Sequence, residues 1–151
     1  MERVDKKRFL AWCDHHVRRI YVHAELVDNL PELFALARER RVDLGLALFR
    51  DTNITTIRPH LKTITGVLLL AVTPGMSGEE VDLGTLERIR KVREMHSRLH
   101  ITLDGGVRVG VARSAVEKGA TRLVAASAIF AMHNPKEAYE YLVHDAESAL
   151  G

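Results

Sequence analysis

The sequence has little of several features that mark specialised classes of protein. Its one cysteine, Cys13, excludes a disulfide within the chain and agrees with a reducing, cytoplasmic location. Its formal net charge is only +2, which argues against nucleic acid or a membrane as partner. The longest apolar run, residues 67–72, is too short to cross a bilayer. The charged amino-terminal stretch is not followed by an apolar segment, so no signal peptide is expected.

What remains is the composition of an ordinary globular protein. The chain has 151 residues, of which 46% are hydrophobic and 28% are charged, and this is enough for one domain with its own core. No linker or low-complexity segment interrupts it, so residues 1–151 are expected to form one domain. The densest basic run, residues 88–93, shares its stretch with apolar residues at helical spacing. It therefore indicates the solvent face of an amphipathic helix.

Hydrophobic periodicity predicts helices and strands that alternate along the chain, the pattern of an α/β fold with parallel strands. Residues 67–72 are apolar on both faces, which is typical of a parallel strand buried on both sides. The expected strands are residues 20–25, 42–49, 67–72, 101–106 and 122–128. The expected helices are residues 5–16, 31–41, 54–61, 83–99, 109–118 and 135–149.

Two architectures fit this order of elements. One is an open, doubly wound sheet, and the other is part of a (β/α)₈ barrel, because five strands cannot close a normal barrel of about 250 residues. In both, ligands bind at the carboxyl ends of the strands. The residues expected there are Glu25, Arg50, residues 73–79, Asp104-Gly105-Gly106 and Ala126-Ser127.

The stretch Asp104-Gly105-Gly106 is the most informative of these strand ends. A strand that ends in a carboxylate places the charge at the rim of the sheet, and paired glycines leave backbone N–H groups open to a phosphate. The same three residues are also an ordinary turn signal. Alone, the triplet does not decide between a substrate site and a turn.

Five segments, in order, resemble the ribulose-phosphate 3-epimerase family. Residues 72–78 are similar to its V-x-P-G-F-G-G loop, residues 103–107 to its V-D-G-G-I, and residues 124–130 to its V-A-G-S-A-I-F. Residues 21–25 are similar to its F-H-x-E strand, and residues 45–47 to its G-L-A strand. The resemblance extends from about Val4 to the carboxyl terminus.

The resemblance implies a (β/α)₈ barrel that inverts C3 of a ketopentose phosphate, converting ribulose 5-phosphate to xylulose 5-phosphate with two Asp acid/bases and a divalent metal. Asp104 matches one of the two Asp residues, which also binds the metal. The residues that match phosphate donors are Gly75, Met76, Ser77, Gly78, Gly105, Gly106, Ala126 and Ser127.

The match covers only the last five strands of the family's barrel. The second Asp and the metal-binding histidines belong to the first three strands, so the metal site that this stretch implies is incomplete. The sequence also departs from the family at Ser77 and Ala126, where the family has Gly, at Glu79, where it has Gln, and at Leu70-Ala71, where it has M-T. A carboxylate at residue 79 would repel a phosphate.

Three functions therefore stay open. The chain forms an epimerase with a chain or copy that supplies the missing strands, or it binds a sugar phosphate without catalysis, or it is a structural half-barrel. The first and last strands are expected to have unpaired edges with apolar faces, so a homo-oligomer is predicted. His23 is interpreted as a packed core or rim histidine, and Trp12, Phe9 and Cys13 as residues that face the core.

Overall fold

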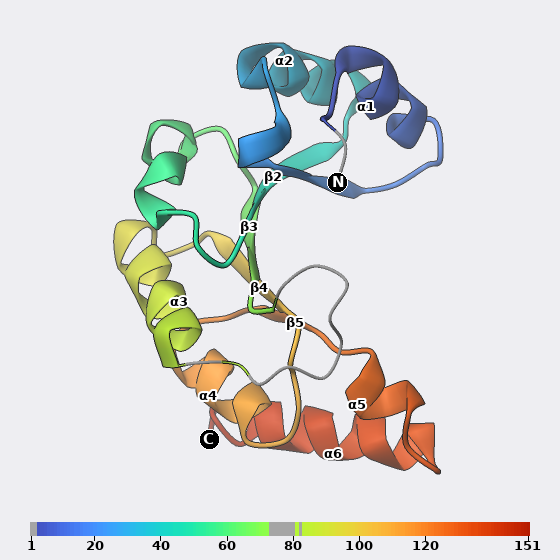
Figure 1. The fold of residues 1–151 in the computed structure, drawn as a ribbon, viewed down its shortest axis with the longest axis vertical. Coiled ribbons are helices and arrows are strands. Elements are labelled where there is room, and N and C mark those ends of the chain that lie inside the picture. Colours follow the sequence, from blue (N-terminus) through green and yellow to red (C-terminus); the bar gives the residue numbers. More distant parts are fainter. Residues whose placement is uncertain (1–2, 73–80, 82) are drawn as a thin grey trace.

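A computed structural model describes residues 3–72, 81 and 83–151 and shows one curved parallel sheet with helices along its convex side (Figure 1). The strands are β1 (Arg19–His23), β2 (Asp43–Leu48), β3 (Gly66–Leu70), β4 (His100–Asp104) and β5 (Arg122–Val124), in that spatial order. The helices are α1 (Lys6–Cys13), α2 (Leu30–Arg40), α3 (Leu83–Met95), α4 (Val111–Glu117), α5 (Ser127–Phe130) and α6 (Pro135–Glu147), and the 3₁₀ helices are η1 (Ala24–Leu26) and η2 (Ile54–His60).

Side-chain caps begin three of the helices, which start within one residue of the predicted positions. Asp5 accepts the backbone N–H of Arg8 at 2.8 Å before α1. Asn29 and Asn134 do the same before α2 and α6, where a proline in the first turn fixes the backbone. The alternation of elements is therefore confirmed, and the boundaries move by a few residues.

The two faces of the sheet differ in chemistry because successive side chains of a strand point to opposite sides. The outer face packs against the helices and is apolar, and eight of its side chains are at most 4% exposed. These residues are Val22, Leu44, Leu46, Leu48, Val67, Leu69, Ile101 and Leu103. This layer of strand and helix side chains is the hydrophobic core.

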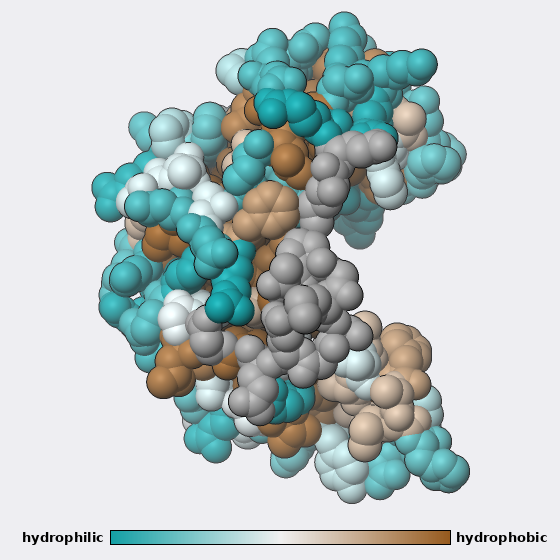
Figure 2. Space-filling model, viewed as in Figure 1, coloured by the Kyte–Doolittle hydropathy of each residue, from teal (hydrophilic) through white to brown (hydrophobic). Residues whose placement is uncertain are grey.

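The register of the strands shows which residues share the inner face. Arg19 pairs with Asp43, and Leu70 pairs with Asp104. The side chains of this face at the amino edge are charged or polar. Figure 2 shows that the molecule is hollowed on one side. The residues of the inner face are Arg19, Tyr21, His23, Asp43, Gly45, Ala47, Gly66, Leu68, Leu70, His100, Thr102, Asp104, Arg122 and Val124. The apolar face expected on β1 is its outer face, where Ile20 and Val22 pack against the core, and its inner face is polar.

Tyr21 explains why two glycines lie on this face. A Cβ at Gly45 would collide with the Tyr21 ring, and a Cβ at Gly66 would lie 2.9 Å from its hydroxyl. The ring therefore lies across the backbone of β2 and β3, and its hydroxyl is 3.2 Å from Thr102 Oγ1 on β4. The contact joins the first and fourth strands across the inside of the curved sheet.

One expectation about the core is wrong. Phe9 is buried, but Trp12 is 57% exposed and contacts His15 edge-on. At about 100° per residue, Leu10 and Cys13 lie on the same side of Phe9 and Trp12 lies on the other. Cys13 packs against the core as predicted, and burial raises the pKa of its thiol.

Among the helices of the described residues, none is long and apolar enough to cross a membrane.

Candidate functional site at the carboxyl edge of the sheet

Asp104 ends β4 on the inner face, where the register pairs it with Leu70 on β3 and Val124 on β5. Its carbonyl oxygen accepts the N–H of Ala71 at 2.8 Å, so its backbone is held between two strands. The side chain is half-buried. Burial raises the pKa of the Asp104 carboxyl above its ordinary value, and a backbone hydrogen bond at Gly105 offsets part of that rise.

The turn after Asp104 requires glycine. Gly105 has φ 99° and Gly106 has φ 64°, both in the left-handed region that L side chains seldom adopt. A Cβ at Gly105 would also lie 2.5 Å from Val72 Cγ2. The chain therefore turns sharply beside Asp104 and presents successive backbone groups at the rim.

The end of β5 differs from the expectation. The strand predicted over residues 122–128 ends at Val124, and Ser127 begins the short helix α5. The Ala126 carbonyl accepts the N–H groups of Ile129 and Phe130 at 3.0 and 2.8 Å. These helical hydrogen bonds replace a sheet ladder, because β5 has a neighbour on one side only among the described strands.

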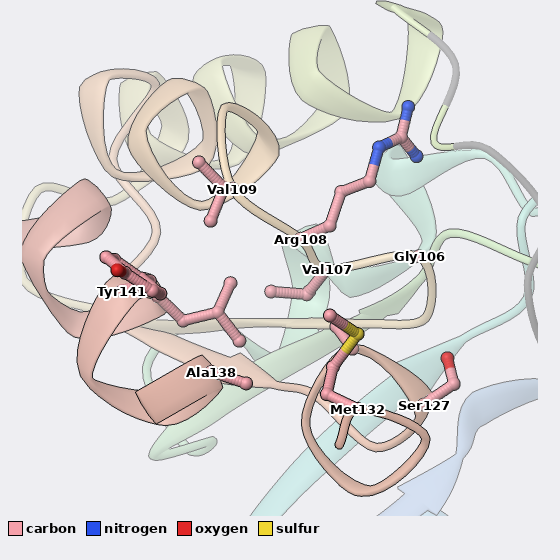
Figure 3. Close-up of a pocket in the computed structure, with 10 residues that line it drawn as sticks. Gly106, Val107, Arg108, Val109, Ser127, Met132, Ala138 and Tyr141 are labelled. Atoms are coloured by element: carbon pink, nitrogen blue, oxygen red, sulfur yellow. The ribbon is translucent and has the colours of Figure 1, made fainter. Parts of the chain in front are cut away.

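A cavity of about 440 Å³ brings the two turns together, because Gly106 and Ser127 both line it (Figure 3). Its other walls are mostly apolar and come from the start of α4 and from α5 and α6. The guanidinium of Arg108 points away from the side chains of Val107 and Tyr141 in Figure 3. The remaining lining residues are Val109, Ala128, Met132, Ala138 and Leu142.

Glu25 holds the ends of β1 and β2 together rather than facing a substrate. It follows β1 in η1, and its carboxylate accepts the N–H of Phe49 at 3.0 Å and the hydroxyl of Thr52. Burial raises the pKa of Glu25, but these hydrogen bonds outweigh it and the net direction is downward. His23 Nδ1 lies 3.5 Å from Glu25 Oε2, and its ring stacks on Phe49 at 4.2 Å. His23 is the packed rim histidine that the sequence predicts.

Arg88 on α3 fixes the same loop from the other side. Its guanidinium donates to the carbonyl oxygens of Phe49, Arg50 and Thr52 at 2.6 to 2.9 Å. The segment that follows β2 is therefore clamped between the Glu25 carboxylate and the Arg88 guanidinium. Nothing in the sequence indicates this contact, because Arg88 belongs to a basic run that predicts only a solvent-facing helix.

Comparison with known proteins identifies the family. The sequence model of the ribulose-phosphate 3 epimerase family matches residues 2–130 of this chain. The chain belongs to the ribulose-phosphate 3-epimerase family. The ribulose-phosphate 3-epimerase of Chlamydia muridarum is 36% identical over 118 residues, which are 74% of this chain and 52% of that protein. The Bacillus subtilis enzyme is 33% identical over 122 residues, 78% of this chain and 56% of that protein.

This epimerase-family chain spans about half the length of the curated relatives that it matches. Solved structures agree on the fold. The orotidine 5'-monophosphate decarboxylase of Sulfolobus solfataricus superposes with a TM-score of 0.72 at 15% identity, over 100% of this chain and 73% of that one. A structure titled "Native KDPGal structure" gives a TM-score of 0.65 at 10% identity, over 97% of this chain and 66% of that one. The predicted α/β class and incomplete barrel are confirmed.

The described residues do not form the family's metal site by themselves. No group of three or more His, Cys, Asp or Glu side chains in this part of the chain is arranged to hold an ion. Asp104 is the residue that the family resemblance assigns to the metal, and Glu25 is held by Phe49 and Thr52. The predicted phosphate residues Gly75, Met76, Ser77 and Gly78 lie outside the described residues. Gly105, Gly106, Ala126 and Ser127 lie on neighbouring turns.

An apolar wall that the sequence does not predict lies beside these turns. Val109, Met132 and Tyr141 line the cavity, although each is more than half exposed. The signal in the sequence was an excess of large apolar residues around residues 130–141, which helical periodicity alone does not explain. Val109 precedes α4, Met132 follows α5 and Tyr141 lies in α6, so elements far apart in the chain build this wall.

The raised pKa of Asp104 predicts that Asp104→Asn stabilises the fold at neutral pH. A carboxyl whose pKa is higher in the folded protein contributes stability below the unfolded value, about 3.9, and loses it as the pH rises through the folded value. The variant should therefore match the wild type near pH 3 and exceed it near pH 7. Urea unfolding at both pH values measures this, and a variant that is less stable at pH 7 contradicts it.

Proposed function

We propose that this chain forms the phosphate-binding part and one acid/base of a ribulose-phosphate 3-epimerase site, which inverts C3 of ribulose 5-phosphate. The observation that carries the proposal is Asp104 on the inner rim, with a pKa raised by burial, beside a turn of two glycines with positive φ. Family membership supports the chemistry. The position of Asp104 at the carboxyl end of a parallel strand supports the site.

Asp104 is the proposed base in this reaction. Its carboxylate removes the proton from C3, the C3–H electron pair moves toward C2, and negative charge develops on the carbonyl oxygen to give an enediolate. A general base works best when its pKa approaches the working pH, and burial moves Asp104 in that direction. The same carboxyl can return the proton to the face from which it came.

Inversion requires a second acid/base on the opposite face of the sugar. Among the inner-face residues that the structure describes, Asp43 is the other carboxylate, and it lies at the start of β2 beside Arg19. The described residues therefore support proton removal, and Glu25, another carboxylate at this rim, is held by Phe49 and Thr52. The second group and the divalent metal of the family are proposed to come from outside these residues.

The phosphate is proposed to bind the backbone N–H groups of the two neighbouring turns. Successive N–H groups in a left-handed turn form a concave anion site, and Gly105 and Gly106 have this conformation. Ser127 lines the same cavity as Gly106, and Ala126 directly precedes it in the chain. From the family resemblance, residues 75–78 complete this site.

The test is the fate of the C3 hydrogen of ribulose 5-phosphate in deuterated water, followed by NMR, together with a coupled assay for xylulose 5-phosphate. Divalent metal is added to both. Deuterium at C3 with product formed supports the whole reaction. Deuterium without product supports Asp104 as a single base. If a sample shown to be folded gives neither deuterium at C3 nor product, the epimerase proposal is contradicted.

A second candidate is a protein that binds the sugar phosphate without catalysis. The observation that favours it is that Glu25, another carboxylate at the rim, is held by Phe49 and Thr52. Titration calorimetry with ribulose 5-phosphate separates this function from the structural one. Heat that saturates without C3 exchange supports binding alone. If no heat is seen at millimolar ligand, binding is contradicted and the structural half-barrel is the function that fits.

We also expect the chain to associate through its open strand edges. Both β1 and β5 have a neighbour on one side only among the described strands, and unpaired backbone groups of an edge strand pair readily with another chain. The partner is either a second copy or a chain that supplies further strands. Light scattering of the purified chain should give at least twice the monomer mass. A stable monomer across micromolar concentrations contradicts self-association.

A further inference from the structure

The amino edge of the inner face carries a second pocket, at the opposite end of the strands from Asp104. The pocket has a volume of about 440 Å³ and is lined by Arg18, Arg19, Tyr21, Asp43 and Arg122. We propose that this amino-edge pocket binds a small oxyanion of the phosphate class, a phosphate monoester or pyrophosphate, independently of the carboxyl-edge site.

The charges that line the pocket do not balance. Arg19 Nη2 pairs with Asp43 Oδ2 at 2.8 Å, and this satisfies the one carboxylate of the lining. Arg18 and Arg122 are exposed, and neither side chain has an ion pair within the described part of the chain. Two guanidinium charges therefore remain without a counter-charge, and an anion that binds between them would reduce their mutual repulsion.

Arg19 contributes a donor that is already removed from water. Its side chain is only 18% exposed, and its Nε is buried without a hydrogen-bond partner among the described residues. A buried donor of this kind is costly unless an acceptor is supplied. Because the guanidinium binds carboxylate and phosphate oxygens through two parallel N–H groups, a phosphate oxygen is a suitable acceptor for the open Nε.

The pKa of His100 is affected by the same positive charges. It begins β4 on the inner face and pairs with Gly66 in the register. Burial lowers the pKa of its imidazole, and the positive charges of Arg122, Arg19 and Arg93 lower it further, while Asp43 acts in the opposite direction. An anion in the pocket should therefore raise the pKa of His100, which gives the proposal a spectroscopic readout.

The geometry separates this pocket from the proposed substrate site. Arg122 pairs with Thr102, whereas Asp104 lies two residues further along β4, about 7 Å toward the carboxyl edge. Tyr21, which also lines the pocket, is tied to Thr102 by its hydroxyl. A volume of about 440 Å³ is within the usual range for small-molecule sites, about 300–1,000 Å³. The pocket therefore has room for an organic phosphate.

The test follows the His100 imidazole signals by NMR during titration with inorganic phosphate and then pyrophosphate, with chloride keeping the ionic strength constant. We expect a saturable shift and a higher His100 pKa in the bound state. Arg122→Gln should weaken binding about tenfold or more, because a charge-assisted contact is lost. Arg19→Gln should also weaken binding about tenfold or more. Because Arg122 is exposed, Arg122→Gln is the variant that is expected to fold normally.

The matched control is Arg113→Gln on α4, an exposed arginine that pairs with Glu117 at 2.8 Å. It should leave the affinity within about twofold, because Arg113 does not line the pocket. The proposal is overturned if phosphate causes no shift at tens of millimolar. It is also overturned if Arg122→Gln and Arg113→Gln weaken binding equally, because that result means non-specific charge attraction. Loss of epimerase activity has no bearing on either outcome.

Discussion

Asp104→Asn is expected to slow deuterium exchange at C3 of ribulose 5-phosphate by about 10²–10⁴-fold, the usual contribution of a general base. The amide keeps the size of the side chain but cannot accept the C3 proton. Ligand affinity should stay within about threefold, because the proposed phosphate contacts come from backbone groups at Gly105 and Gly106. Exchange measured by NMR, with calorimetry on the same samples, separates the two effects.

The control for this prediction is Asp14→Asn. Asp14 follows α1, and its side chain is 70% exposed and pairs with Arg40 at the surface. The same chemical change there should leave exchange and affinity unaltered. If Asp104→Asn retains wild-type exchange, then Asp104 is a turn residue and another group removes the proton. If affinity falls as far as exchange, the change has damaged the site as a whole.

Leu103→Ala should destabilise the fold by about 2–5 kcal/mol, the range measured for emptying a buried leucine site. Leu103 is fully buried on the outer face of β4, directly before Asp104. Both neighbouring strands pair with β4, so the cavity lies in the middle of the sheet, where relaxation is difficult. For a chain of this size each kcal/mol lowers Tm by about 2–4 °C.

Leu150→Ala provides the matched comparison, because Leu150 is 77% exposed near the end of the chain. It should change the unfolding free energy by less than about 0.5 kcal/mol. Calorimetry or urea unfolding of both variants measures the difference. Equal, small effects would mean that the outer face of the sheet is not the core of the protein.

The sequence predicts the core of this fold well because burial leaves a local signal. The apolar run that contains β3 indicates a strand covered on both sides, and Asp5, Asn29 and Asn134 indicate helix starts. Asp104 is placed correctly at a strand end for the same reason, since the apolar strand and the glycine turn are adjacent in the chain. These features depend on neighbours within a few residues.

The features that the sequence did not predict depend on residues far apart in the chain. Tyr21 meets Thr102, and Arg88 meets the loop after β2, only because the sheet curves and α3 packs behind it. The charged amino edge joins Arg19 to Arg122 in the same way. At α5 the local signal was ambiguous, because Ala and Ser residues can end a strand or begin a helix.

The most direct test of the proposed carboxyl-edge site is an NMR titration of the ¹⁵N-labelled chain with ribulose 5-phosphate. We predict saturable shifts of the backbone amides of Gly105, Gly106, Ala126 and Ser127, with the amides of β1 and α1 unchanged. Shifts confined to Arg19 and Arg122 would place the phosphate in the amino-edge pocket. That result, or no shift in a folded sample, would contradict a sugar-phosphate site around Asp104.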